Sequence, residues 1–332
     1  MKLTRSKIEY RKAIRWKSIF WAFLIIIICI IGYFTYQGIG IYQSLGDLHK
    51  TKEESLFKNV ITTEEIKPPE WTGTERVNIL LLGGDARGLK ENQVPRSDSI
   101  LVVSIDPVAK TANLFSVLRD TYVKIPDHSS NRINTALTFG GPELAMKTVG
   151  NLLNLDIQYY VYADFEGFKS LIDSIGGIEI NVEKDMYYID NADGNRYDID
   201  LKKGFQHLDG SEALQYVRFR YDATSDFTRT ERQRKFLSAV AKELQSAWNL
   251  LRMKQIIESV TPYIETNIDR DSLLKLAVLG KNSQVGEAVQ LPPMDQLKYS
   301  VIGGAQVLTI RDENKLKEYV RSVLRISPPL NH

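Results

Sequence analysis

The beginning of the chain changes abruptly from charged to apolar sequence. Residues 2–17 contain seven lysines and arginines and one glutamate, whereas residues 18–36 contain no charged side chain. An uncharged apolar stretch of this length matches the roughly 20 residues that a membrane-spanning helix needs. A buried helix of a soluble domain and a cleaved signal peptide are the alternatives, but the stretch has no polar face and no small-residue cleavage pattern follows it. The pattern therefore predicts a transmembrane helix over residues 18–38.

The charges that flank this stretch set its orientation. Residues 1–17 form a basic tail, whereas only Lys50 and Lys52 lie within about fifteen residues after the apolar stretch. The positive-inside rule then places the tail in the cytoplasm and the rest of the chain outside the plasma membrane. Residues 39–74 are polar and end in KPPEWTG. We interpret them as an extracellular stalk, partly helical, that precedes a folded domain over residues 75–328.

Within that domain, continuous apolar runs predict strands that are buried on both faces, at residues 77–82, 100–105 and 112–118. The expected elements that follow are a helix over 142–153, a strand over 159–163, a helix over 166–174, a strand over 178–182, an irregular excursion over 183–204, helices over 210–217 and 229–249, more helix to about 280, strands near 285–291 and 300–309, and a helix over 313–324. Strands interleaved with helices predict a three-layer α/β/α domain with a mixed central sheet.

Composition excludes several classes of protein. The chain has 332 residues, 43% of them hydrophobic and 25% charged, and a net charge of +2, which is ordinary for a globular protein and argues against a diffuse nucleic-acid surface. Its only cysteine, Cys29, lies in the apolar stretch, so the outer domain is held by its core without disulfides. The four histidines are far apart, which argues against a zinc centre. No GxxxxGK loop, GxSxG elbow or dinucleotide fingerprint is present.

Two aspartates and an arginine are expected at one edge of the sheet. Asp85 follows the first strand after two glycines, and Asp98 begins the second. If these strands pair antiparallel, the two carboxylates face each other, and their repulsion calls for a cation; oxygen ligands suit Mg²⁺. The third strand ends at Arg119, which brings a guanidinium to the same edge. A tight turn with a solvated Asp85 is the alternative interpretation.

Five arginines are crowded into residues 218–234. Arg218 and Arg220 alternate, so that in an extended chain both would point to one side. The sequence TRTE at residues 228–231 fits a capping box that starts a helix, and Arg229 and Gln233 would then face the core near a helix N-terminus, which favours an anion. Arg232 shares that face.

The positive charges of these arginines need negative partners. Three acids nearby could simply pair with the arginines: Asp222, Asp226 and Glu231. The inward-facing arginines outnumber these acids, however. Phosphate or pyrophosphate is the natural anion, since a guanidinium binds such oxygens in a bidentate manner.

At this point the chain resembles the LytR-CpsA-Psr family. The residues that carry the resemblance are GGDAR at 83–87, RSDS at 96–99, RDTYVKIP at 119–126, LDGSEALQYVRFR at 208–220 and RTERQR at 229–234, in the family's order. The resemblance as a whole covers about residue 77 to residue 248, roughly half of the chain. One departure is visible, because the family usually has proline before the RD pair, whereas Val117 and Leu118 stand here.

The resemblance implies a Mg²⁺-dependent transferase of Gram-positive cell envelopes, with Mn²⁺ as the alternative metal. Such enzymes move a glycopolymer (teichoic acid, capsular or related polysaccharide) from undecaprenyl pyrophosphate to peptidoglycan through a phosphodiester. The residues that match the family's site are Asp85 and Asp98 for the metal, and Arg119, Arg218, Arg220, Arg229 and Gln233 for the pyrophosphate, with Arg87, Arg96 and Arg232 as further members. Asp98, Asp120 and Asp226 are the candidate general bases. A polyprenyl-pyrophosphate phosphatase and a non-catalytic regulator or scaffold remain the alternatives.

Overall fold

The computed structural model of the chain describes residues 35–51, 53–60, 71–84, 94–189, 198–219 and 225–326, without the side chains at 225–231, 233 and 234. The basic tail and nearly all of the expected transmembrane helix lie outside these residues. Among the helices of the described ranges, none is both long and apolar enough to cross a membrane. The tail and the span therefore stay predictions.

The centre of the fold is a six-stranded mixed sheet with the order β11-β6-β1-β2-β3-β12. Its strands are β1 (Val77–Gly84), β2 (Ser97–Asp106), β3 (Thr111–Val117), β6 (Tyr159–Asp164), β11 (Ile264–Thr266) and β12 (Gln284–Leu291). β1 runs parallel to β6 and β3 runs parallel to β12, whereas the other neighbours are antiparallel. The predicted mixed sheet is confirmed.

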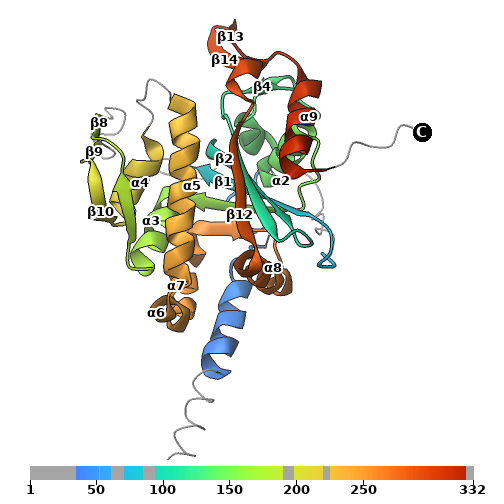
Figure 1. Cartoon of the computed structure of the whole chain (residues 1–332). Helices are drawn as coiled ribbons and strands as arrows, with labels where there is room; N and C mark the ends of the chain where they lie inside the picture. Colours follow the sequence, from blue (N-terminus) through green and yellow to red (C-terminus); the bar gives the residue numbers. More distant parts are fainter. Residues whose placement is uncertain are drawn as a thin grey trace, which may run out of the picture.

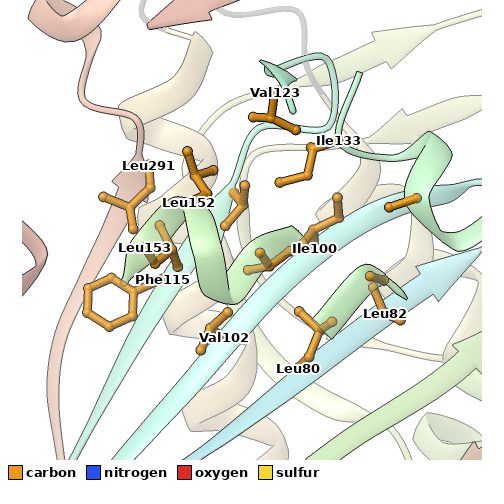
Figure 2. Close-up of a cluster of buried hydrophobic side chains, with 14 of the residues drawn as sticks. Leu80, Leu82, Ile100, Val102, Phe115, Val123, Ile133, Leu152, Leu153 and Leu291 are labelled. Atoms are coloured by element: carbon orange, nitrogen blue, oxygen red, sulfur yellow. The ribbon is translucent and has the colours of Figure 1, made fainter. Parts of the chain in front are cut away.

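Helices cover both faces of this sheet (Figure 1). On one face, alternate strand residues such as Leu80, Ile100 and Val102 form a core cluster with α2 (Thr135–Leu153) and α9 (Glu313–Leu324). Figure 2 shows how the side chains of this cluster interdigitate. On the opposite face, Ile79 and Val103 pack with α8 (Arg270–Asn282). These two packed faces confirm the predicted layers of helix, sheet and helix.

A second hydrophobic cluster joins the segments between β6 and the C-terminal part of the chain. Its elements are α3 (Phe165–Ser174), β7 (Ile178–Val182), β8 (Met186–Tyr188), β9 (Ile199–Leu201), β10 (Gly204–Leu208), α4 (Gly210–Arg218), α5 (Ser225–Leu244) and α7 (Met253–Val260). The expected irregular excursion over 183–204 is wrong in part, because β8 pairs with β9 and β10 pairs with β7. Met186, Ile199 and Leu201 are buried there, which gives these short strands an inner face.

Three further boundaries differ from the prediction. The helix expected from residue 142 begins at Thr135, about two turns earlier, because α2 includes a kink at Gly140 and Gly141 before Pro142. The further helix expected up to about residue 280 is instead α6 (Ala247–Leu251), α7 (Met253–Val260), a 3-10 turn over Thr261–Tyr263, β11 and α8. The single strand near 300–309 is a hairpin of β13 (Leu297–Ile302) and β14 (Ala305–Ile310).

Part of the segment expected to be a stalk packs against the folded domain. Residues 35–46 are helical. Farther on, the buried carboxylate of Glu265 in β11 accepts hydrogen bonds from the Ser55 hydroxyl at 2.7 Å, the Leu56 amide at 3.0 Å and the Tyr160 hydroxyl at 3.0 Å. Phe57 has no exposed surface and lies in the main core cluster. Residues 55–57 thus belong to the folded domain.

Candidate active site at one edge of the sheet

The end of β1 lies beside the start of β2, as predicted. Gly83 pairs with Ser99 and Gly84 pairs with Ser97, so Asp98 is the extra residue of a β-bulge. A bulge bends its strand and re-aims a side chain, and bulges are common next to active sites. Asp85 follows Gly84 directly but lies outside the described residues. The structure therefore places Asp98 at the expected edge, and the facing of the two carboxylates stays a prediction.

The second glycine of this strand end is required by its neighbours. A β-carbon on Gly84 would lie 2.8 Å from the hydroxyl oxygen of Tyr162 and 3.2 Å from the Arg96 carbonyl oxygen. Tyr162 belongs to β6 and is fully buried, so its ring has little room to move. The absence of a side chain at Gly84 thus lets three strands approach one another where the site begins.

Arg119 reaches the same edge from β3. Ile100 of β2 pairs with Val117, so that the chain after Val117 continues alongside Asp98. The Arg119 guanidinium donates a hydrogen bond to the Asp98 carboxylate in an ion pair, and each side chain is about one third exposed. The predicted meeting of acid and arginine is confirmed. Leu118 directly precedes the RD pair, where the family usually has a proline. It is buried, and its amide donates a hydrogen bond to the Leu291 carbonyl.

A second acid holds Arg119 from the other side. The Asp120 carboxylate lies 3.5 Å from Arg119 Nε and 3.3 Å from a terminal nitrogen of Arg132. Arg132 lies in the short strand β5 (Asn131–Arg132), which pairs with β4 (Tyr122–Val123). Sequence reasoning missed Arg132, because only this pairing brings it beside Asp120. Asp120 is thus bound to two guanidinium groups and orients both.

Arg218 comes to this edge from another direction than expected. It is the last residue of α4, whose N-terminus has a capping box formed by Asp209 and Glu212, so the expected extended conformation is wrong at this residue. Its guanidinium carbon lies 5.4 Å from the centre of the Phe165 ring. Phe165 follows β6, whose last residue, Asp164, pairs with Gly84. Arg218 is therefore held next to the carboxyl end of β6, beside that of β1.

Arg232 faces inward, as predicted, but its described partners are protein groups. Its side chain is 2% exposed, and Nε lies 2.8 Å from the carboxylate of Glu183. A terminal nitrogen donates a hydrogen bond to the Phe219 carbonyl at 2.5 Å. Glu183 is not among the acids expected to neutralise the cluster. Because Phe219 follows Arg218 directly, Arg232 fixes the chain that carries Arg218.

The remaining predicted residues are only partly described. Arg96 is exposed beside the bulge. Asp85, Arg87 and Arg220, and the side chains of Asp226, Arg229 and Gln233, lie outside the described residues. The helix expected to begin at the capping box begins instead at Ser225, so Arg229 lies in its second turn. Within the described part of the chain, no group of three or more His, Cys, Asp or Glu side chains is placed to hold a metal ion.

Comparison with known proteins decides the family. A model of the LytR_cpsA_psr family matches residues 34–317. The chain belongs to this family. LytR_cpsA_psr membership, expected from the five motifs, is thereby confirmed, and the match includes the helix at residues 35–46 together with the whole sheet.

Curated relatives in the family carry two kinds of name. A polyisoprenyl-teichoic acid–peptidoglycan teichoic acid transferase, TagU of Bacillus mycoides strain KBAB4, is 33% identical over 284 residues, which cover 83% of this chain and 88% of TagU. Regulatory protein MsrR of Staphylococcus aureus strain COL is 37% identical over 196 residues, 58% of this chain and 57% of MsrR. One relative is thus named as a transferase and the other as a regulatory protein.

Solved structures share the fold. A structure described as TagT bound to LI-WTA has a TM-score of 0.63 and 27% identity, and the match covers 80% of this chain and 97% of that one. The crystal structure of Bacillus subtilis TagV has a TM-score of 0.59 and 30% identity, with 77% and 99% covered. The mixed sheet and its helices are therefore those of the family.

Proposed function

We propose that this protein transfers a teichoic acid or related glycopolymer from a polyprenyl pyrophosphate carrier to peptidoglycan. The observation that carries the proposal is that Asp98 and Arg119 form an ion pair at the same edge of the sheet at which Arg218 lies on Phe165, after the carboxyl end of β6. The family match and the TagU relative, named as a teichoic acid transferase, support the same chemistry. The apolar residues 18–36 would anchor the chain in the plasma membrane with this site on the outer side.

The reaction follows from the charges at the edge. An acceptor hydroxyl of peptidoglycan forms a bond to the phosphorus next to the sugar, and the bond from that phosphorus to the bridging oxygen breaks. The lipid phosphate leaves with the bonding electrons, so that a phosphodiester links polymer to glycan. Arg119 and Arg218 stabilise the negative charge on the phosphoryl oxygens. The pyrophosphate bond supplies the driving force, and no nucleotide is consumed.

One of three carboxylates takes the proton of the acceptor hydroxyl. Asp98 and Asp120 both touch Arg119, and Asp120 binds Arg132 as well, so Asp120 is more fully occupied in holding guanidinium groups. The third candidate is Asp226, near the start of α5. A carboxylate within hydrogen-bond reach of the hydroxyl serves as general base.

We propose that a magnesium ion binds at this edge. One carboxylate oxygen of Asp98 pairs with Arg119, and the side chain is about one third exposed. Asp98 also lies beside Gly84, the residue that precedes Asp85 in the sequence. Mg²⁺ is usually bound by one or two carboxylates together with substrate phosphates and water, so a cage of three acids is not required. Asp98 and Asp85 would hold the ion. When bound, it would neutralise charge on the transferred phosphate.

A transfer assay tests this function. The full chain in detergent would be incubated with lipid-linked glycopolymer, peptidoglycan and Mg²⁺, and the polymer joined to glycan would be measured. We expect transfer by the wild-type protein and a loss of about 10²–10³-fold in the Arg119→Gln variant, the usual cost of removing one charge-stabilising donor. Arg311→Gln is the matched control, because Arg311 is exposed and its Nε bonds to the Leu297 carbonyl at 3.0 Å.

The products separate the alternatives. Free polymer in place of joined polymer would show hydrolysis, the activity of a phosphatase. No turnover in the wild type, with polymer still bound, would favour a regulator or scaffold, the role that the name of the relative MsrR suggests. Equal activity of Arg119→Gln and Arg311→Gln would refute the assigned site.

A further inference from the structure

The short helix α6 exposes apolar side chains in a fixed orientation. Trp248 is 65% exposed, Leu250 54% and Leu251 40%. Asn249, between them, is buried, and its side-chain amide donates hydrogen bonds to the Ile175 carbonyl at 2.8 Å and the Glu243 carbonyl at 2.9 Å. Because Asn249 points inward, the outward direction of its neighbours is set by the fold. A Trp and two Leu side chains so held are unusual for a surface that meets only water.

The helix at residues 35–46 extends this apolar surface. The Gln37 side chain donates a hydrogen bond to the Leu251 carbonyl at 2.8 Å. Lys254 Nζ lies 5.6 Å from the centre of the Tyr36 ring. Tyr36 is 65% exposed and Ile39 is 55% exposed. Figure 1 shows α6 and α7 at the same end of the molecule as this helix, with the β13–β14 hairpin at the other end.

We call the exposed residues Tyr36, Ile39, Trp248, Leu250 and Leu251 the α6 patch.

Cationic side chains lie along the α6 patch. The Arg252 guanidinium carbon lies 5.6 Å from the centre of the Trp248 ring, and Arg252 is only partly buried. Lys254 is also partly buried and lies 3.5 Å from Glu258. Tryptophan and tyrosine are enriched where a protein meets the headgroup layer of a membrane. Lysine and arginine there bury their stems and extend their charges toward lipid phosphates.

We propose that the α6 patch rests in the headgroup layer of the membrane that anchors the chain. The decisive feature is continuity, because Tyr36, at the start of the described helix, is also the last residue of the uncharged stretch at 18–36. Tyr36 of the α6 patch therefore lies in the last turn of the transmembrane helix predicted over residues 18–38. This inference rests on the membrane anchoring in the proposed function, and it adds that the domain itself lies on the lipid in one orientation.

Spin-label accessibility tests this contact in the full chain. Cys29→Ser removes the only cysteine. In that background, Leu250→Cys carries a label in the α6 patch, and Tyr299→Cys is the matched control on β13, where Tyr299 is 74% exposed. The proteins would be reconstituted in vesicles of phosphatidylcholine and phosphatidylglycerol. Collisions with oxygen, which enters lipid, and with a nickel chelate, which stays in water, would be measured at each label.

We expect a clearly higher ratio of oxygen to nickel collisions at residue 250 than at residue 299. We also expect that the added changes Trp248→Ser and Arg252→Gln lower the ratio at 250 toward that at 299. Equal ratios at the two sites would overturn the proposal, and shielding of residue 250 from both reagents would overturn it in favour of a protein partner. Release of the protein from vesicles by an alkaline wash would show instead that the anchoring itself fails.

Discussion

The ion pair between Arg232 and Glu183 is the best place to perturb the arginine cluster without touching substrate. Arg232→Met removes the guanidinium but keeps much of the side-chain volume. The carboxylate of Glu183 then loses its partner at 2.8 Å, and the Phe219 carbonyl loses its donor at 2.5 Å. If Arg232 is a positioning residue, both the stability of the fold and the rate of transfer should fall.

The magnitude follows from burial. Breaking a fully buried ion pair typically costs about 3–5 kcal/mol. Glu183 is 31% exposed and can recover some water, whereas Arg232 is 2% exposed. We therefore expect a loss of about 2–3 kcal/mol in the free energy of unfolding, between the values for buried and for surface pairs. Replacing both partners, with Arg232→Met and Glu183→Met, should cost less than the sum of the single changes, with a coupling of about 0.5–3 kcal/mol.

Urea unfolding of the full chain in detergent, followed by circular dichroism, measures this effect in the absence of substrate. Lys242→Met is the control, because Lys242 is exposed on the same helix and should change stability by less than about 0.5 kcal/mol. An Arg232→Met protein that unfolds at the wild-type urea concentration would refute the structural role. Normal stability combined with lost lipid binding would show that Arg232 contacts the pyrophosphate directly.

Three further predictions test the surroundings of the site. Phe57→Ala should lower the free energy of unfolding by about 3–5 kcal/mol, since Phe57 is fully buried, whereas Leu56→Ala at a 49% exposed position should have little effect; urea unfolding checks both. Gly84→Ala should reduce transfer strongly with the fold retained, because the new methyl meets the Tyr162 hydroxyl; transfer and circular dichroism are compared in parallel. Burial raises the pKa of Asp269, but hydrogen bonds from the α8 amides and a serine outweigh it, so the pKa lies below its ordinary value. At neutral pH, Asp269→Ala should therefore lower the free energy of unfolding by about 1 kcal/mol, because the helix cap is lost. Asp269→Asn should keep the cap, but the free energy of unfolding should then fall less steeply below about pH 4 than in the wild type, as acid unfolding curves would show.

The sheet and its charged edge were predictable because they depend on patterns local to each strand. Continuous apolar runs marked β1, β2 and β3, and antiparallel pairing alone brings Asp98 to the end of β1. The antiparallel pairing of β3 with β2 brings Arg119 to Asp98. These inferences needed only the order of strands and the positions of acids and arginines relative to strand ends.

The parts that could not be predicted depend on contacts between distant segments. Arg132 reaches Asp120 only through the pairing of two-residue strands, and Glu183 reaches Arg232 across nearly fifty residues of chain. β11 has only three residues, so its apolar signal is too short to separate from the helices around it. Glu265 in that strand then bonds to Ser55, which is why part of the expected stalk belongs to the domain.

The central claim is that the sheet edge formed by Asp98, Arg119 and Arg218 binds the pyrophosphate of the lipid carrier. A crystal structure of the protein with a polyprenyl pyrophosphate tests it most directly. We predict phosphate oxygens within hydrogen-bond distance of the Arg119 and Arg218 guanidinium groups, with the ion pair between Arg119 and Asp98 opened or shared with a metal. A pyrophosphate bound elsewhere, with that ion pair unchanged and Arg218 out of reach, would contradict the account.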